Sequence, residues 1–130
     1  MPMLDITQET VADIAVLDDD VDFRNYIEDF LKDESIYTVR TFAHPRELFA
    51  SCEEHVPNIV LLDMKMGDVN GDKVLGQLLA RWPALCVVIV TGYPDSDLMA
   101  KALEIGPFTM ISKPVDIAQI QKTVDRIVGV

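Results

Sequence analysis

The stretch IAVLDDD (residues 14–20) decides the fold, because an uninterrupted apolar run is followed at once by three acids. Three more apolar runs end on a polar residue: residues 59–62 on Asp63, residues 87–90 on Thr91, and residues 110–112 on Lys113. Short buried runs are typical of strands in a parallel sheet, whose carboxyl ends meet at one edge. An open sheet of this class keeps its ligand crevice at that edge. We therefore expect these polar side chains to form one site.

The segments between the apolar runs have the spacing of amphipathic helices. Pro45 suits the first turn of the second of them. The inward residues expected are Phe23, Ile27, Phe30 and Leu31 on the first helix, Leu48, Phe49 and Cys52 on the second, Val74, Leu75, Leu78 and Leu79 on the third, Leu98, Ala102 and Ile105 on the fourth, and Ile117, Ile120, Val124 and Ile127 on the last. This alternation predicts an α/β fold, a doubly wound parallel sheet with helices on both faces.

Three boundaries follow from local composition. Residues 37–42 are less hydrophobic than the other runs, which indicates an edge strand. Residues 64–71 read as a loop long enough to close over a site. The fourth helix is expected to be capped by Asp95 or Ser96 and to end at residues 106–107.

Size and charge bound the function. With 130 residues we expect a single domain over residues 1–130, in which residues 1–10 are the candidate loose segment. The formal net charge of -11 disfavours direct binding to nucleic acid or to an anionic membrane. The sequence has no apolar stretch of membrane-spanning length and no secretory leader pattern, so we expect a cytoplasmic protein.

The cysteines and histidines carry no pattern of a metal site. Cys52 and Cys86 lack ligand spacing and lie in apolar patterns, so both are expected to be buried free thiols. His44 and His55 each stand near a proline without a second ligand at the right spacing, and we interpret them as surface-loop residues.

The acidic edge has its own chemical requirement. Asp18, Asp19 and Asp63 would repel one another at close quarters, and a cation relieves that repulsion. An all-oxygen, carboxylate-rich site suits Mg²⁺, or Mn²⁺, better than zinc. Lys113 adds a fixed positive charge and Thr91 a hydroxyl donor, as phosphoryl transfer onto a carboxylate requires. Asp63 is the preferred acceptor because it stands alone at the end of an apolar run.

The ordered motifs resemble a known family. They are VLDDD (16–20), LLDMKM (61–66) with Gly71 eight residues past Asp63, Thr91-Gly92 and Lys113-Pro114. Their order and spacing resemble the receiver domain of bacterial two-component response regulators over about residues 13–128. The resemblance implies a five-stranded parallel sheet of order 2-1-3-4-5 and a phosphorelay signalling role.

The resemblance also implies roles for single residues. Asp63 would accept a phosphoryl group from a histidine of a sensor kinase or phosphotransfer protein. Mg²⁺ would be bound by Asp19, Asp63 and the backbone carbonyl of Lys65, with Asp18 acting through water. The backbone of Lys65 and the backbone N–H of Gly92, together with Thr91, would bind the phosphoryl oxygens, and Lys113 would pair with them. The Lys113-Pro114 bond is a candidate cis peptide.

The switch implied by the family involves the face of the fourth and fifth helices. Exposed candidates on that face are Asp97, Lys101, Glu104, Gln119 and Lys122. Met110 stands where relatives usually carry an aromatic switch residue, and Phe108 is a nearby aromatic of undecided role. Lys65 and Tyr93 occupy the two positions that tune phosphoryl lifetime in the family, and Gly67 stands where proline is common.

Three alternatives stay open at this point. A flavodoxin-type carrier needs a Ser/Thr/Gly-rich phosphate loop, but residues 18–22 contain four acids. A Mg²⁺-dependent aspartyl phosphohydrolase usually has a second acid two residues after its nucleophile, where this chain has Lys65. A receiver-like interaction domain would never be phosphorylated. We expect no enzymatic activity other than self-phosphorylation and slow autodephosphorylation. The sequence does not decide the output domain, the effector or whether the protein forms a homodimer.

Overall fold

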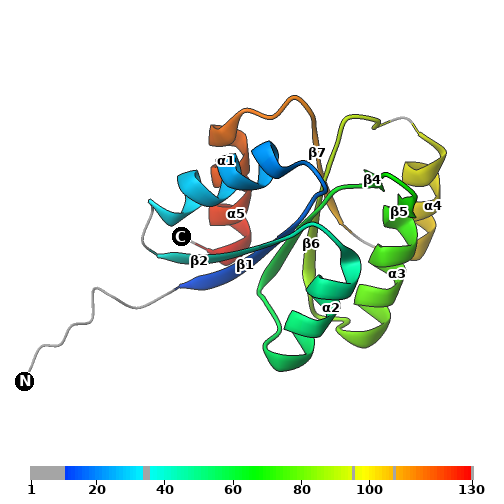
Figure 1. The fold of residues 1–130 in the computed structure, drawn as a ribbon, viewed down its shortest axis with the longest axis horizontal. Coiled ribbons are helices and arrows are strands. Elements are labelled where there is room, and N and C mark those ends of the chain that lie inside the picture. Colours follow the sequence, from blue (N-terminus) through cyan, green and yellow to red (C-terminus); the bar gives the residue numbers. More distant parts are fainter. Residues whose placement is uncertain (1–10, 34–35, 95, 107, 130) are drawn as a thin grey trace, which may run out of the picture.

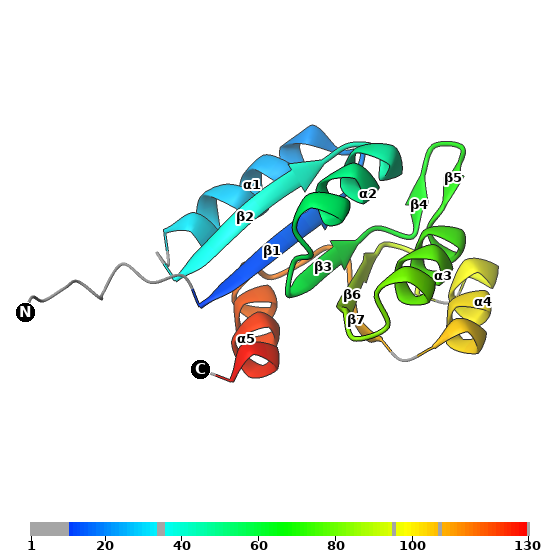
Figure 2. The same cartoon turned by 90° about the horizontal axis from the view of Figure 1, so that it is seen from below.

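The computed structural model describes residues 11–33, 36–94, 96–106 and 108–129, and residues 1–10 and Asp95 therefore lie outside the described residues. A five-stranded parallel sheet has the order β2-β1-β3-β6-β7 (Figures 1 and 2). Its strands are β1 (Ala12–Leu17), β2 (Tyr37–Phe42), β3 (Ile59–Leu62), β6 (Cys86–Thr91) and β7 (Thr109–Ser112). In sequence order within this sheet the arrangement is 2-1-3-4-5, as the family resemblance implies. The expected edge position of residues 37–42 is confirmed.

In the described part of the chain, five helices cover the sheet. They are α1 (Val21–Lys32), α2 (Pro45–Glu54), α3 (Gly71–Arg81), α4 (Asp97–Ile105) and α5 (Ile117–Val128). One face packs against α1 and α5, and the other packs against α2, α3 and α4 (Figure 1). The two layers confirm the predicted doubly wound fold.

Strand β1 shows why the apolar runs are continuous. Ile14 and Val16 pack in the core on the α1 and α5 side, whereas Ala15 and Leu17 pack in the core on the opposite side. All four side chains are buried. Because successive side chains in a strand point to opposite faces, a strand covered on both faces is apolar at every position. The run therefore ends where the strand reaches the polar edge.

Polar residues start the helices where the sequence changes from apolar run to amphipathic stretch. The Asp20 carboxylate caps α1, His44 caps α2 directly before Pro45, and Ser96 caps α4. Such caps satisfy backbone N–H groups that have no partner within the helix. Of the two caps proposed for the fourth helix, Asp95 and Ser96, the structure therefore has Ser96.

Two burial predictions are wrong. Ile105 is 39% exposed, whereas α4 buries Ala102 as predicted and also Met99, which was not predicted. Its position as the last residue of the helix, just before Gly106, takes Ile105 out of the buried stripe. Cys86 is exposed because it is the first residue of β6 and lies at the end of the sheet, whereas Cys52 is buried as predicted.

The predicted loop at residues 64–71 contains a short antiparallel hairpin, β4 (Lys65–Met66) paired with β5 (Val69–Asn70). Gly67 turns the hairpin with φ +56°, a left-handed conformation that glycine adopts at low cost. Gly71 closes the segment, since its N–H donates to the Met64 carbonyl at 2.7 Å. A Cβ at Gly71 would lie 2.6 Å from Cα of Met64, so only glycine fits there. The chain directly after Asp63 is therefore held against the start of α3.

Candidate functional site

Three carboxylates meet at the carboxyl edge of the sheet. Asp18 and Asp19 follow β1, and Asp63 follows the neighbouring strand β3. The backbone N–H of Asp63 donates to the Leu17 carbonyl at 3.0 Å, which continues the strand pairing into the site. One carboxylate oxygen of each aspartate lies within 4.8 Å of those of the other two. Asp18 and Asp63 are buried, and Asp19 is exposed.

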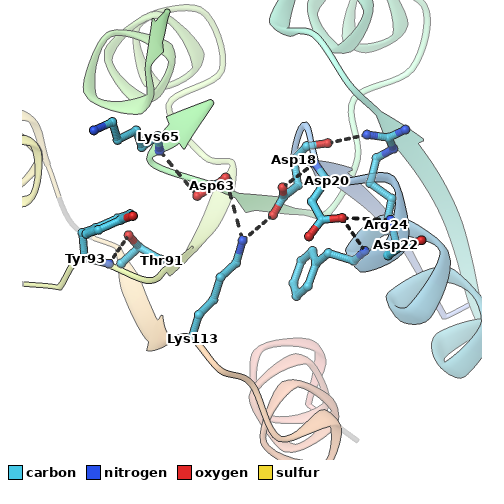
Figure 3. Close-up of polar contacts among 10 residues, drawn as sticks. Asp18, Asp20, Asp22, Arg24, Asp63, Lys65, Thr91, Tyr93 and Lys113 are labelled. Atoms are coloured by element: carbon cyan, nitrogen blue, oxygen red, sulfur yellow. Dashed lines mark hydrogen bonds and ion pairs between the residues drawn. The ribbon is translucent and has the colours of Figure 1, made fainter. Parts of the chain in front are cut away.

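Lys113 brings a positive charge to these carboxylates from the end of β7. Its Nζ lies 2.8 Å from Oδ2 of Asp18 and 3.8 Å from Oδ2 of Asp63 (Figure 3). Its backbone N–H donates to the Thr91 carbonyl at 2.7 Å, which fixes the root of the side chain at the end of β6. The Lys113-Pro114 peptide is cis, as the resemblance implies. The ammonium therefore pairs with the carboxylate that follows β1, Asp18, and with the one that follows β3, Asp63.

The environment of Asp63 disfavours its charge. The pKa of Asp63 is raised from its ordinary 3.8 to about 6, chiefly because the carboxyl is buried and then because the Asp18 charge lies beside it. The Lys113 ammonium and the backbone N–H of Lys65 act in the opposite direction and lower this pKa, while Asp19 raises it. Asp63 is thus a carboxylate that gains from any added positive charge.

Replacing Asp63 by asparagine is expected to stabilise the metal-free domain at neutral pH. Because the folded-state pKa is raised, the wild type loses stability as pH rises from about 4 through about 6, and the neutral amide does not. At pH 7 in chelator-treated buffer we expect the free energy of unfolding of the variant to exceed that of the wild type by about 2 kcal/mol. Below pH 4 this difference should vanish. Thermal unfolding against pH measures this. Asp68→Asn, an exposed carboxylate in the hairpin turn, is the matched control, and equal gains in both variants would contradict the assignment.

The hairpin side of the site carries Lys65. Its backbone N–H donates to Oδ1 of Asp63 at 3.4 Å, and its ammonium lies 5.6 Å from the centre of the Tyr93 ring. Thr91 is fully buried, and its Oγ1 accepts a hydrogen bond from the Tyr93 N–H at 3.0 Å (Figure 3). Lys65, Thr91 and Tyr93 line one cavity of about 240 Å³ together with Met64 and residues at the start of α4.

Gly92, expected from sequence to offer its N–H to a phosphoryl group, lies beside Lys113. A Cβ at Gly92 would be 3.9 Å from Cβ of Lys113. The structure thus brings Asp18, Asp19 and Asp63 together with Lys113, places Lys65 against Asp63, and places Thr91 and Gly92 on the adjoining strand end.

Three site residues escaped the sequence analysis. Asp20 caps α1, Arg24 donates from its guanidinium to the Asp18 carbonyl at 2.7 Å, and the Phe23 ring lies against the Lys113 ammonium. The cap could have been found, because an aspartate directly before an amphipathic stretch is a helix-start signal. Nothing in the sequence signals the contacts of Arg24 and Phe23.

The donor set fits a hard divalent cation. The ligating groups of the cluster are carboxylate oxygens of three aspartates, and it includes no sulfur or imidazole ligand among the described residues. Mg²⁺ prefers such oxygen ligands and retains several waters, for which exposed Asp19 leaves room. Burial and the Asp18 charge raise the pKa of Asp63 despite the opposing Lys113 ammonium, so added positive charge would favour the ionised cluster.

The residues expected on the switching face are accessible. Asp97, Lys101 and Glu104 are exposed on α4, and Gln119 and Lys122 are exposed on α5. Met110 on β7 is 42% exposed, so in this state it does not fill the core. Phe108 is half-buried and packs against the core on the α2, α3 and α4 side.

No helix in the described part of the chain combines the length and the apolarity needed to cross a membrane.

Comparisons with known proteins agree with this geometry. A family model for the response regulator receiver domain matches residues 14–125. The DNA-binding transcriptional regulator NtrC of Salmonella typhimurium is 32% identical over 114 residues, which cover 88% of this chain and 24% of that protein. The chain likewise spans 26% of the transcriptional regulatory protein ZraR of Escherichia coli, at 29% identity. It therefore spans about a quarter of the length of these curated relatives.

A solved receiver domain matches this chain over most of its length. The crystal structure of the receiver domain of NtrX from Brucella abortus has a TM-score of 0.80 at 25% identity, and the alignment covers 89% of this chain and 98% of that one. The similarity thus extends over nearly the whole of that receiver domain. With the family model matching most of its length, the chain belongs to the response regulator receiver domains of two-component signalling.

Proposed function

We propose that Asp63 is the residue that accepts the phosphoryl group, and that the donor is a phosphohistidine of a sensor kinase or phosphotransfer protein. One observation carries the proposal: Asp63 is only 7% exposed, lies in a three-carboxylate cluster, and has the Lys113 ammonium 3.8 Å away. A buried carboxylate whose charge is disfavoured gains from reaction with an electrophile when cations stand ready for the added phosphoryl oxygens.

The transfer is a displacement at phosphorus. An oxygen of Asp63 attacks the phosphorus, the P–N bond to the donor imidazole breaks, and the imidazole leaves with the bonding electrons and takes up a proton from solvent. Lys113 pairs with one phosphoryl oxygen, and the Thr91 hydroxyl and the Gly92 N–H donate to others. Mg²⁺ held by Asp19, Asp63 and the Lys65 carbonyl, with Asp18 acting through water, would neutralise charge on the same oxygens.

The proposed consequence is a change in the α4, β7 and α5 face. Thr91 donates its hydroxyl toward the phosphoryl group, and the segment after β6 follows it because the Tyr93 N–H is bonded to Oγ1 of Thr91. That segment leads directly into α4. We propose a cytoplasmic domain that passes its signal to an output domain or effector through this face and does not itself bind nucleic acid.

The phosphohydrolase alternative is less well supported. Such enzymes usually carry a second acid two residues after the nucleophile, but that residue here is Lys65, whose side chain lies over the Tyr93 ring. The receiver is therefore proposed to be modified and released slowly, without turnover of small phosphate esters.

The deciding experiment is intact-mass measurement of the chain after incubation with phosphoramidate and Mg²⁺. The wild type should gain one phosphoryl group, and Asp63→Asn should gain none. Asp68→Asn, five residues further on and exposed, is the matched control and should be modified like the wild type. Equal modification of the wild type and Asp63→Asn would exclude Asp63 as the acceptor, and an unmodified wild type would favour an interaction domain that is not phosphorylated.

Lys65 and Tyr93 are expected to prolong the phosphorylated state. Their cation–π pair joins the hairpin to the segment after β6, and both residues line the cavity that Thr91 also lines. We propose that the pair restricts the approach of water to the phosphoryl group from that side. Replacing both by alanine should speed phosphate loss by about three- to ten-fold. The decay of phosphorylated protein after donor removal measures the rate. Lys73→Ala, an exposed lysine of α3, is the control, and an unchanged decay in the double variant would refute the role.

A further inference from the structure

The ammonium of Lys113 has an aromatic contact in addition to its two carboxylates. Its Nζ lies 4.5 Å from the centre of the Phe23 ring on α1. The face of an aromatic ring is negatively polarised and attracts a cation, more strongly where water is partly excluded. The Lys113 side chain is 25% exposed, so this contact is partly shielded. Phe23 lies outside the motifs on which the resemblance to receiver domains rests.

The loop that carries the acids also fixes the ring. The Asp20 carboxylate accepts hydrogen bonds from the N–H groups of Asp22 at 3.0 Å and Phe23 at 3.4 Å, which sets the first turn of α1. Arg24 bonds the Asp18 carbonyl and ties the same turn to the end of β1. Phe23 is half-buried and packs against the core on the α1 and α5 side. The position of Phe23 relative to Asp18 is therefore set by hydrogen bonds between side chains and the backbone of this turn.

The ammonium lies closer to Asp18 than to Asp63, at 2.8 Å against 3.8 Å. An ammonium paired closely with Asp63 would occupy the oxygen that must attack phosphorus. The Phe23 ring and the Asp18 carboxylate together bind the Lys113 ammonium beside that oxygen. We propose that Phe23 is a positioning residue of the phosphorylation site, whose ring holds the Lys113 ammonium next to Asp18 and within reach of the incoming phosphoryl oxygens. This inference rests on the proposed role of Asp63.

Replacing Phe23 by leucine tests the role, since leucine keeps an apolar side chain and removes the ring face. With phosphoramidate and Mg²⁺, the rate of phosphorylation by intact mass should fall by about five-fold. Phe30→Leu removes the same atoms from the same helix and the same core, and should leave the rate unchanged. Phe23→Tyr keeps the ring and should restore the wild-type rate. A Phe23→Leu protein as fast as the wild type would overturn the inference.

Two further measurements separate attraction from packing. In a Lys113→Met background the effect of Phe23→Leu should disappear, and an equal slowing in both backgrounds would show that the ring acts only through packing. Phenylalanine analogues with one, two or three ring fluorines keep the shape and weaken the ring face, so the rate should fall stepwise; a flat series overturns the inference even if the leucine variant does not fold. An unmodified wild type would instead overturn the proposed function of Asp63.

Discussion

Phosphorylation of Asp63 is expected to slow by about 100-fold or more when Asp19 is replaced by asparagine or when Mg²⁺ is chelated. The physical reason is charge: the phosphoryl oxygens arrive at a cluster in which, among the residues that the structure describes, Asp18, Asp19 and Asp63 are balanced by the Lys113 ammonium. Without a divalent cation the developing negative charge meets carboxylates on two sides. Each 1.36 kcal/mol of lost stabilisation costs about ten-fold in rate, and one well-placed cation supplies several kcal/mol.

The measurement is the rate of mass gain as Mg²⁺ is titrated into chelator-treated protein. Asp19→Asn should need far more Mg²⁺, and Mg²⁺ should raise the unfolding temperature of the wild type but not of this variant. Asp22→Asn makes the same change three residues away, outside the cluster, and should behave like the wild type. If chelated wild-type protein is modified at full rate, the metal proposal is wrong.

The sequence predicts most of this site because of strand direction. When parallel strands end on Asp18, Asp63, Thr91 and Lys113, these residues lie at the same edge of the sheet, irrespective of how the connecting helices pack. The observed register brings the ends of β1 and β3 side by side, with Leu17 opposite Leu62. The edge position of β2 follows from its lower hydrophobicity in the same way.

Prediction fails where a residue lies at the end of an element or in a very short one. Cys86 and Ile105 fit apolar periodicities, but Cys86 is the first residue of its strand and Ile105 the last residue of its helix. At such a terminus the element does not continue on one side, so the side chain is less covered. The β4–β5 hairpin has two residues in each strand, too few for a period of two to be recognised. Its position depends on the close approach of Gly71 to Met64, which is a tertiary contact.

The contacts that adjust the site are likewise not predicted by any pattern in the sequence. Phe23 and Lys113 are distant in sequence, and Phe23 matches the apolar stripe of α1 equally well as a core residue. Arg24 reads as an ordinary exposed helix charge until its bond to the Asp18 carbonyl is seen. Chain-specific adjustments of a family site are therefore found from coordinates, whereas the shared groups are found from motif spacing.

Replacing Lys113 by methionine is expected to lower the rate of Asp63 phosphorylation about 100-fold at pH 7, because methionine keeps the length and apolar packing of the side chain but removes its charge. The loss acts twice. No ammonium is left to pair with the phosphoryl oxygens, and Asp63 loses the side-chain cation that lowers its pKa, so this pKa rises further and less of the carboxylate is ionised.

The second effect gives a signature that a packing defect does not produce. The rate of the Lys113→Met variant should recover in part as pH rises, with its apparent pKa displaced upward from that of the wild type. Lys113→Arg keeps the charge in a planar fork and should retain an intermediate rate without that displacement. Lys101→Met removes an exposed charge from α4 and serves as the matched control. A Lys113→Met variant with the wild-type rate and pH profile would show that the ammonium 3.8 Å from Asp63 takes no part in the transfer.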